Sequence, residues 1–157
     1  MTSGPVDDAT TSAKHDTERH GLRVLVVEDD PSLRDIIVEA LEGEGHTVRA
    51  TDDGAVALRW IAESAPNVVL LDMVMPQADV DGFEFIARLK TAPPEVREVP
   101  LVLLSALGPS LSAAIDARSA SALNIVWVVS KPCDLSELLS VTRAAGQQRR
   151  GRGRASG

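Results

Sequence analysis

Cysteine, aromatic residues and long apolar runs are all scarce in this chain of 157 residues. Cys133 is the single cysteine, which excludes a framework of internal disulfides. No apolar run approaches the roughly 20 residues that a membrane-spanning helix needs. Residues 1–20 also lack the apolar core of a secretory signal peptide. We therefore expect a soluble protein of the reducing cytoplasm, with no membrane partner.

The two signs of charge are unevenly distributed along the chain. The formal net charge is −7, but residues 21–142 hold nine basic and nineteen acidic residues, a net −10. Residues 143–157 hold five arginines and no acidic residue. An acidic central region disfavours nucleic acid as the main partner, because phosphate binding needs clustered lysine and arginine. A divalent cation or a basic partner fits this charge better.

The two ends of the chain lack any apolar period. This predicts a disordered N-terminal tail over residues 1–20 and a disordered, basic C-terminal tail over residues 146–157. The folded unit is then residues 21–145, which is the length of one ordinary domain.

Short apolar runs alternate with amphipathic segments inside this unit. Runs that are apolar throughout are typical of strands in a parallel sheet covered on both faces. Four such runs are residues 23–27, 67–71, 100–104 and 124–129. Residues 46–50 are more polar and predict a strand at the edge of the sheet.

Helical spacing and capping residues mark the segments between the strands. Asp30, Asp53 and Asp134 each precede an amphipathic run and predict a helix start. The apolar positions of two further predicted helices are Phe83, Ile86, Ala87 and Leu89, and Leu111, Ala114 and Ile115. Five strand–helix units in succession predict an α/β fold with a doubly wound parallel sheet. Such sheets bind ligands beyond the carboxyl ends of their strands.

Side chains with useful chemistry stand at those predicted strand ends. Glu28 and Asp29 follow the first strand and Asp72 ends the third, while Ser105 and Lys131 end the fourth and fifth. Clustered carboxylates repel one another, and a divalent cation such as Mg²⁺ relieves that repulsion. An ammonium and a hydroxyl suit phosphoryl oxygens, so the set indicates displacement at phosphorus with a carboxylate nucleophile.

These residues lie in motifs that resemble the receiver domain of two-component response regulators. Residues 24–31 (Val-Leu-Val-Val-Glu-Asp-Asp-Pro) are similar to the family's acidic-pair segment, and residues 70–82 to its phosphoacceptor segment. Residues 104–106 and 131–132 match its hydroxyl and lysine segments. The resemblance covers residues 22–142. It implies a flavodoxin-like (βα)5 fold with a five-stranded sheet in the order 2-1-3-4-5.

The resemblance also implies a phosphorylation site and a metal site. Asp72 is the expected phosphoacceptor, and the donor is a histidine kinase or a histidine phosphotransfer protein. Asp29 and Asp72 are expected to ligate Mg²⁺ or Mn²⁺ directly. Glu28 would act through a water molecule and Val74 through its backbone carbonyl.

Ser105 and Lys131 are expected, on the same resemblance, to contact the phosphoryl group and report its presence. The family often has an aromatic switch residue three positions before the lysine, but Val128 stands there. Trp127 is its neighbour, and strand alternation places the two side chains on opposite faces of the sheet. The usual aromatic switch is therefore missing at this position.

One loop and two single positions also differ from the family pattern. The segment 76–82 is longer than usual and is expected to bring Asp79 near the site. Val74 and Leu107 occupy positions where the family tunes hydrolysis of the acyl phosphate, and both are apolar. Neither side chain can orient water by hydrogen bonding. We expect no enzyme in the usual sense, only slow self-catalysed phosphorylation and dephosphorylation.

The expected function is that of a single-domain response regulator, because no output domain follows the last predicted helix. Phosphorylation would switch a surface that binds an unidentified output protein. The alternative is a pseudo-receiver, an adaptor or binding module that works without phosphorylation. A flavodoxin-like cofactor binder is disfavoured because residues 28–30 are acidic and repel phosphate. An aspartate-nucleophile phosphatase is disfavoured because no second aspartate follows two residues after Asp72.

Overall fold

Five parallel strands form a single sheet in the computed structural model, in the order β2-β1-β3-β4-β5. The structure describes residues 21–107, 110–111, 115 and 122–156. The strands are β1 (Arg23–Val27), β2 (Thr47–Thr51), β3 (Val68–Asp72), β4 (Leu101–Ser105) and β5 (Ile125–Ser130). The doubly wound α/β fold and its strand order are as predicted from the sequence. The polar strand β2 lies at the sheet edge, which is also confirmed.

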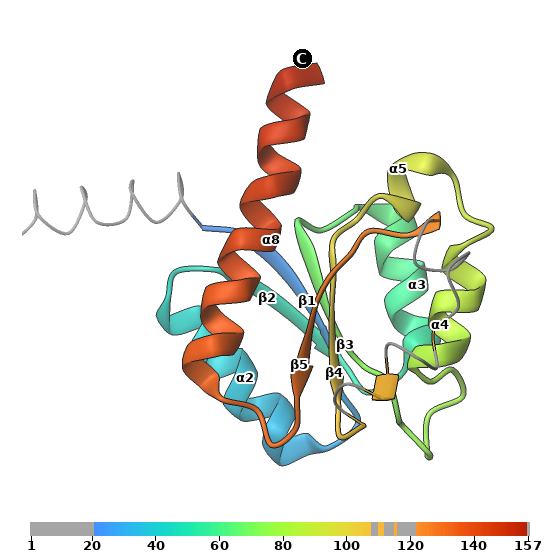
Figure 1. Ribbon diagram of the computed structural model, residues 1–157, viewed down its shortest axis with the longest axis vertical. Helices are drawn as coiled ribbons and strands as arrows, with labels where there is room; N and C mark the ends of the chain where they lie inside the picture. The colour runs from blue at the N-terminus through green and yellow to red at the C-terminus, as the bar shows by residue number, and fades with distance from the viewer. Residues whose placement is uncertain (1–20, 108–109, 112–114, 116–121, 157) are drawn as a thin grey trace, which may run out of the picture.

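Helices cover both faces of this sheet (Figure 1). They are α2 (Pro31–Gly43), α3 (Gly54–Glu63), α4 (Gly82–Leu89), the short α5 (Pro94–Arg97) and α8 (Leu135–Ser156). One hydrophobic cluster joins the strands to α3 and α4, and a second joins them to α2 and α8. Neighbouring strand residues alternate between the clusters: Leu71 belongs to the first and Leu70 to the second. The strands are therefore apolar throughout because both of their faces are buried.

Helix α2 begins where its cap predicts. The Asp30 carboxylate accepts the backbone N–H groups of Ser32 at 3.0 Å and Leu33 at 3.4 Å, and Pro31 holds the first helical position. This start fixes where the chain turns out of β1. Glu28 and Asp29 are thereby held at the carboxyl end of the sheet.

The apolar face of α4 differs from its prediction. Phe85 is fully buried, whereas Phe83 is 37% exposed and Ala87 is exposed. The helix begins at Gly82, whose missing side chain lets the backbone approach the Asp72 carbonyl oxygen. That contact turns the row containing Phe85 and Leu89 toward the sheet and Phe83 away from it. The helix predicted from Leu111, Ala114 and Ile115 lies mostly outside the described residues, as do residues 1–20.

Helix α8 is longer than predicted. It continues to Ser156, and Figure 1 shows its last turns extending beyond the sheet, so the structure departs from the disordered tail expected over 146–157. Gly146 lies against the buried side chain of Leu22, which extends the packed part of α8 past residue 145. The following Gln and Arg residues favour helix. No helix in the described part of the chain is long and apolar enough to cross a membrane.

Candidate metal and phosphoryl site

Three carboxylates meet at the carboxyl end of the sheet. Glu28 and Asp29 follow β1, and Asp72 ends β3, which pairs directly with β1. One oxygen from each carboxylate lies within 4.8 Å of the other two. Glu28 is completely buried, Asp72 is 2% exposed and Asp29 is half-buried. Asp79 is exposed and does not belong to this cluster, so the expectation that it would add a carboxylate to the site is not met.

Lys131 neutralises part of this acidic cluster. Its Nζ lies 2.9 Å from Glu28 Oε1 and 3.0 Å from Asp72 Oδ2. Burial alone would lower the pKa of Lys131, but the two carboxylates outweigh burial and raise it. The backbone N–H of Lys131 donates to the Ser105 carbonyl at 2.9 Å, which holds the lysine beside the end of β4. The predicted lysine therefore contacts the predicted phosphoacceptor.

Burial and mutual repulsion destabilise the negative charges of Glu28 and Asp29. Burial is the largest cause of the raised pKa of Glu28, and its neighbour Asp72 raises it further. Burial also raises the pKa of Asp29, with Glu28 adding to the effect. The Asp30 N–H donates to Glu28 Oε2 at 3.1 Å and partly offsets the rise. A bound cation would relieve the repulsion that remains.

Val74 follows the end of β3 by two residues, and Ser105 is the last residue of β4. Ser105 ends β4 and is 1% exposed, and its Oγ accepts the Leu107 N–H at 3.0 Å. The Val74 N–H donates to Asp72 Oδ1 at 3.3 Å, and the Val74 side chain is 52% exposed. The side chain of Leu107 is 45% exposed. Both positions expected to tune hydrolysis thus present apolar side chains to solvent.

Val128 and Trp127 lie on opposite faces of β5, as predicted. Val128 packs against the cluster of α3 and α4, whereas Trp127 Nε1 donates to Glu137 Oε2 of α8 at 3.4 Å. Leu101 pairs with Ile125 and Val102 pairs with Trp127, so a bulge interrupts the register of β4 and β5. Trp127 is 49% exposed. It lies on the α8 face and does not replace the missing aromatic residue at position 128.

The donor set fits Mg²⁺ or Mn²⁺. The three carboxylates supply hard oxygen ligands of the kind that Mg²⁺ and Mn²⁺ prefer, and one oxygen of each lies within 4.8 Å of the other two. When bound, the cation would neutralise carboxylate and phosphoryl charge.

Arg34 and Asp53 support the site without having been identified as site residues in the sequence. Arg34 Nη1 donates to the Glu28 carbonyl at 2.8 Å. Asp53 caps α3 through Ala55 at 2.8 Å and also accepts the N–H groups of Asp79 at 2.8 Å and Val80 at 3.1 Å. Asp53 thus fastens the long segment 76–82 to α3. Only the cap has a sequence signal, because the other two donors come from a distant loop.

Comparison with known proteins identifies the class of this fold and site. The sequence profile of the response regulator receiver domain matches residues 24–143. The chain therefore belongs to the family of response regulator receiver domains. Receiver domains are phosphorylated by histidine kinases of two-component systems, and they bind Mg²⁺ at an acidic site.

Individual relatives are response regulators of greater length. The chain is 34% identical over 122 residues to the DNA-binding transcriptional regulator NtrC of Azospirillum brasilense, covering 78% of this chain and 24% of that protein. It is 35% identical over 130 residues to the transcriptional regulatory protein TcrA of Mycobacterium tuberculosis, covering 82% of this chain and 47% of that protein. The solved receiver domain of NtrX from Brucella abortus superposes with a TM-score of 0.65 at 28% identity, covering 79% of this chain and 98% of that domain. The chain spans about a quarter to a half of these full-length regulators.

Proposed function

We propose that this domain accepts a phosphoryl group on Asp72 from a phosphohistidine donor, a histidine kinase or a histidine phosphotransfer protein. Phosphorylation then switches a surface that binds an output protein. One observation carries the proposal: Asp72 is 2% exposed, contacts Lys131 at 3.0 Å and shares its site with two other carboxylates. A buried carboxylate among like charges is a costly arrangement that structure alone does not require.

The residues of the chain have distinct parts in this reaction. A carboxylate oxygen of Asp72 attacks phosphorus in line, the phosphorus–nitrogen bond of the donor breaks, and the imidazole leaves with the electron pair. Lys131 balances charge on the incoming phosphoryl oxygens, and the Ser105 hydroxyl donates to one of them. Asp29, Asp72 and the Val74 carbonyl would hold Mg²⁺ or Mn²⁺ directly, and Glu28 would hold it through water.

The hydrogen bond between Ser105 and the following loop suggests a route from the site to a binding surface. The Ser105 hydroxyl now accepts from the Leu107 N–H at the start of the following loop. If the hydroxyl donates to a phosphoryl oxygen, that loop contact changes, and a two-state equilibrium shifts toward the phosphorylated form. Val128 stands where the family often has an aromatic residue. The change at Ser105 would therefore occur without an accompanying movement of an aromatic side chain.

The direct test is labelling with a small phosphodonor such as phosphoramidate in the presence of Mg²⁺, followed by intact-mass measurement. The wild-type protein gains one phosphoryl group and the Asp72→Asn variant gains none. Asp79→Asn is the matched control, because Asp79 is an exposed carboxylate of the adjoining loop and lies outside the acidic cluster. Undiminished labelling of Asp72→Asn would refute the assignment.

Beryllofluoride distinguishes a phosphorylation-dependent regulator from a pseudo-receiver. A phosphorylation-dependent regulator binds beryllofluoride with Mg²⁺, and its affinity for the output protein changes. A pseudo-receiver binds its partner equally well with and without it. The expectation that the regulator has a single domain stays a prediction, which the intact mass of the protein isolated from its native cells tests.

A further inference from the structure

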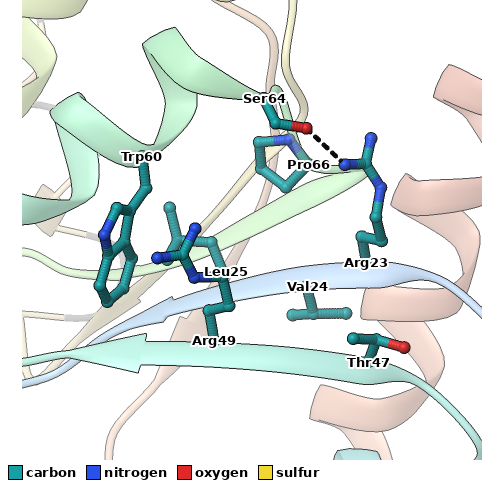
Figure 2. Close-up of a pocket in the computed structure, with 8 residues that line it drawn as sticks. All are labelled: Arg23, Val24, Leu25, Thr47, Arg49, Trp60, Ser64 and Pro66. Carbon is teal, nitrogen blue, oxygen red and sulfur yellow. Dashed lines mark hydrogen bonds between the residues drawn. The ribbon is translucent and has the colours of Figure 1, made fainter.

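A small pocket lined by two arginines and several apolar residues lies toward the opposite ends of the strands from Asp72. Arg23 is the first residue of β1, and Arg49 lies in β2, whereas Asp72 is the last residue of β3. Figure 2 shows Arg23, Arg49, Trp60 and Ser64 around this pocket between the two strands and α3. The pocket has a volume of about 100 Å³. We call it the Arg23–Arg49 pocket.

Neutral groups hold both arginines in place. Arg23 Nη1 donates to Ser64 Oγ at 2.7 Å and Nη2 donates to the Ala65 carbonyl at 2.6 Å. The Arg49 guanidinium lies 3.9 Å from the centre of the Trp60 ring. Such stacking fixes the plane of a guanidinium and leaves the N–H groups at its edge available.

Neither arginine is neutralised by an acid in the described part of the chain. The ion pairs among those residues involve Lys131, Arg88 and Arg143 instead. Two guanidinium groups on exposed residues therefore line one small pocket, and neither has an acidic partner among the described residues.

Apart from the hydroxyl-bearing Thr47 and Ser64, the rest of the wall is apolar. Leu25 is 3% exposed, Pro66 is buried, and the Trp60 ring is half-buried beneath Arg49. An apolar cavity of about 150 Å³ holds benzene, so a pocket of 100 Å³ suits a smaller group. A guanidinium pairs well with a planar carboxylate, and the apolar part of the wall suits a short aliphatic stem.

We propose that the Arg23–Arg49 pocket binds a carboxylate carried on a short aliphatic stem. Two sources supply this chemistry: a free aliphatic acid, and a glutamate side chain of a bound protein. Butyrate and a glutamate blocked at its amino and α-carboxyl groups represent them. The site is independent of the phosphoryl chemistry proposed above, since it shares no residue with it.

Trp60 supplies a direct readout. In a Trp127→Phe background it is the one tryptophan of the chain, so its fluorescence reports this pocket alone. Both carboxylates are titrated at constant ionic strength, with butyramide, which has the shape of butyrate without its charge, as the matched probe. Broadening of the ligand proton NMR signals is measured in parallel, because it does not depend on the tryptophan.

We expect at least one carboxylate to bind saturably and butyramide not to bind. Arg49→Gln should weaken that binding about tenfold or more, as expected for the loss of a charge-assisted hydrogen bond. Arg59→Gln is the matched control, because Arg59 is an exposed arginine of α3 that does not line the pocket. Tighter binding of the blocked glutamate indicates a protein partner, and equal or tighter binding of butyrate indicates a free acid.

Four results would overturn the proposal. They are saturation by butyramide at the same concentration as butyrate, equal binding of inorganic phosphate, unchanged affinity in Arg49→Gln, and no saturable signal with either carboxylate. The NMR measurement decides the Arg49→Gln case if this substitution alters the fluorescence of Trp60 itself. A melting temperature equal to that of the parent confirms that the variant is folded.

Discussion

At the scale of single residues, the ammonium of Lys131 makes the acidic site compatible with a folded chain. Glu28 and Asp72 are almost fully buried, and Lys131 contacts both. An unpaired buried carboxylate is costly, so the lysine stabilises the fold even before any phosphoryl group is present.

Replacing Lys131 by methionine tests this role. We expect Lys131→Met to lower the free energy of unfolding by about 3 kcal/mol in EDTA, because one partner of a buried ion pair is lost. Mg²⁺ should restore more stability to the variant than to the wild type, since it neutralises the same carboxylates. Urea unfolding with and without Mg²⁺ measures both effects.

The control for this substitution is Arg88→Met. Arg88 pairs with Glu84 on the surface of α4 at 3.2 Å, and both side chains are about half exposed. Such surface pairs contribute about 0.5 kcal/mol. An equal effect of the two substitutions in EDTA contradicts the stabilising role of Lys131.

Val74 supports a second prediction at this scale. Its side chain is 52% exposed and apolar, so it offers attacking water no hydrogen bond. Val74→Asn adds a side chain that can hydrogen-bond this water. We expect the variant to hydrolyse the acyl phosphate about tenfold faster, which corresponds to an activation free energy lower by about 1.4 kcal/mol. The decay of the phosphorylated mass measures this rate. Val74→Leu should decay like the wild type, and a wild-type half-life of seconds would contradict slow hydrolysis.

The chemical groups of the site could be predicted from the sequence because they stand at the ends of apolar runs. Glu28, Asp72 and Lys131 follow three such runs, and parallel strands bring their carboxyl ends together. The contact between Lys131 and Glu28 had no such signal, because it depends on side-chain directions across four strands. Asp79 was misplaced for the same reason: chain proximity to Asp72 does not fix the direction of a loop.

At the scale of elements, Asp53 joins α3 to the segment 76–82. Burial alone would raise the pKa of Asp53, but three backbone N–H donors and nearby Arg59 outweigh burial and lower it. In the other direction, the Gly54 N–H donates a hydrogen bond to the Val80 carbonyl at 2.9 Å. The loop after β3 is therefore tied to a helix on one face of the sheet.

We expect Asp53→Ala to destabilise the domain by about 2 kcal/mol at pH 7, because a helix cap and two further bonds are lost. A lowered pKa stabilises the fold above the ordinary carboxyl pKa of 3.8, and this stabilisation is lost as the pH falls through the folded value. The difference in free energy of unfolding between wild type and Asp53→Ala should therefore shrink below about pH 4. Urea unfolding at several pH values measures it.

Asp134→Ala is the matched control. The Asp134 carboxylate accepts only the N–H groups of Ser136 and Glu137 in its own helix, at 2.9 and 3.3 Å, among the described residues. Its loss should cost about 1 kcal/mol, the usual effect of one cap. If Asp53→Ala costs no more than this, the link between α3 and the loop is not a stabilising one.

The sequence predicted which segments are helices or strands. It predicted less well which face of a helix is buried and where a helix ends. Asp30 and Pro31 predicted the start of α2, because capping is a local interaction. The orientation of Phe83 and Phe85 depends on how closely Gly82 approaches β3, which only the packed structure defines. The length of α8 was missed because the Gly-Arg composition conceals the helical preference of its Arg and Gln residues.

At the scale of the whole molecule, we expect the acidic charge to make stability depend on a cation. A cation that binds the folded state at ten times its dissociation constant adds about 1.4 kcal/mol. For a domain of this size we expect the melting temperature to rise by about 4 °C. The comparison is MgCl₂ against NaCl of equal ionic strength, measured by thermal unfolding.

The variant that completes this test is Asp29→Asn. Asp29 is the half-buried member of the carboxylate cluster, so its replacement disturbs packing least. The Mg²⁺-dependent rise should disappear in this variant while the effect of NaCl remains. A rise of the same size in both proteins places the cation elsewhere on the acidic surface.

The closeness of three carboxylates and one ammonium has a thermodynamic consequence. Glu28, Asp29, Asp72 and Lys131 together carry a formal charge of −2. A divalent cation cancels that charge, and a phosphoryl group restores some of it, so each ligand favours the other. In a closed binding cycle the factor by which Mg²⁺ tightens beryllofluoride must equal the factor by which beryllofluoride tightens Mg²⁺. We therefore expect occupancy of the acidic cluster to be cooperative, with two ligands binding more readily together than either does alone.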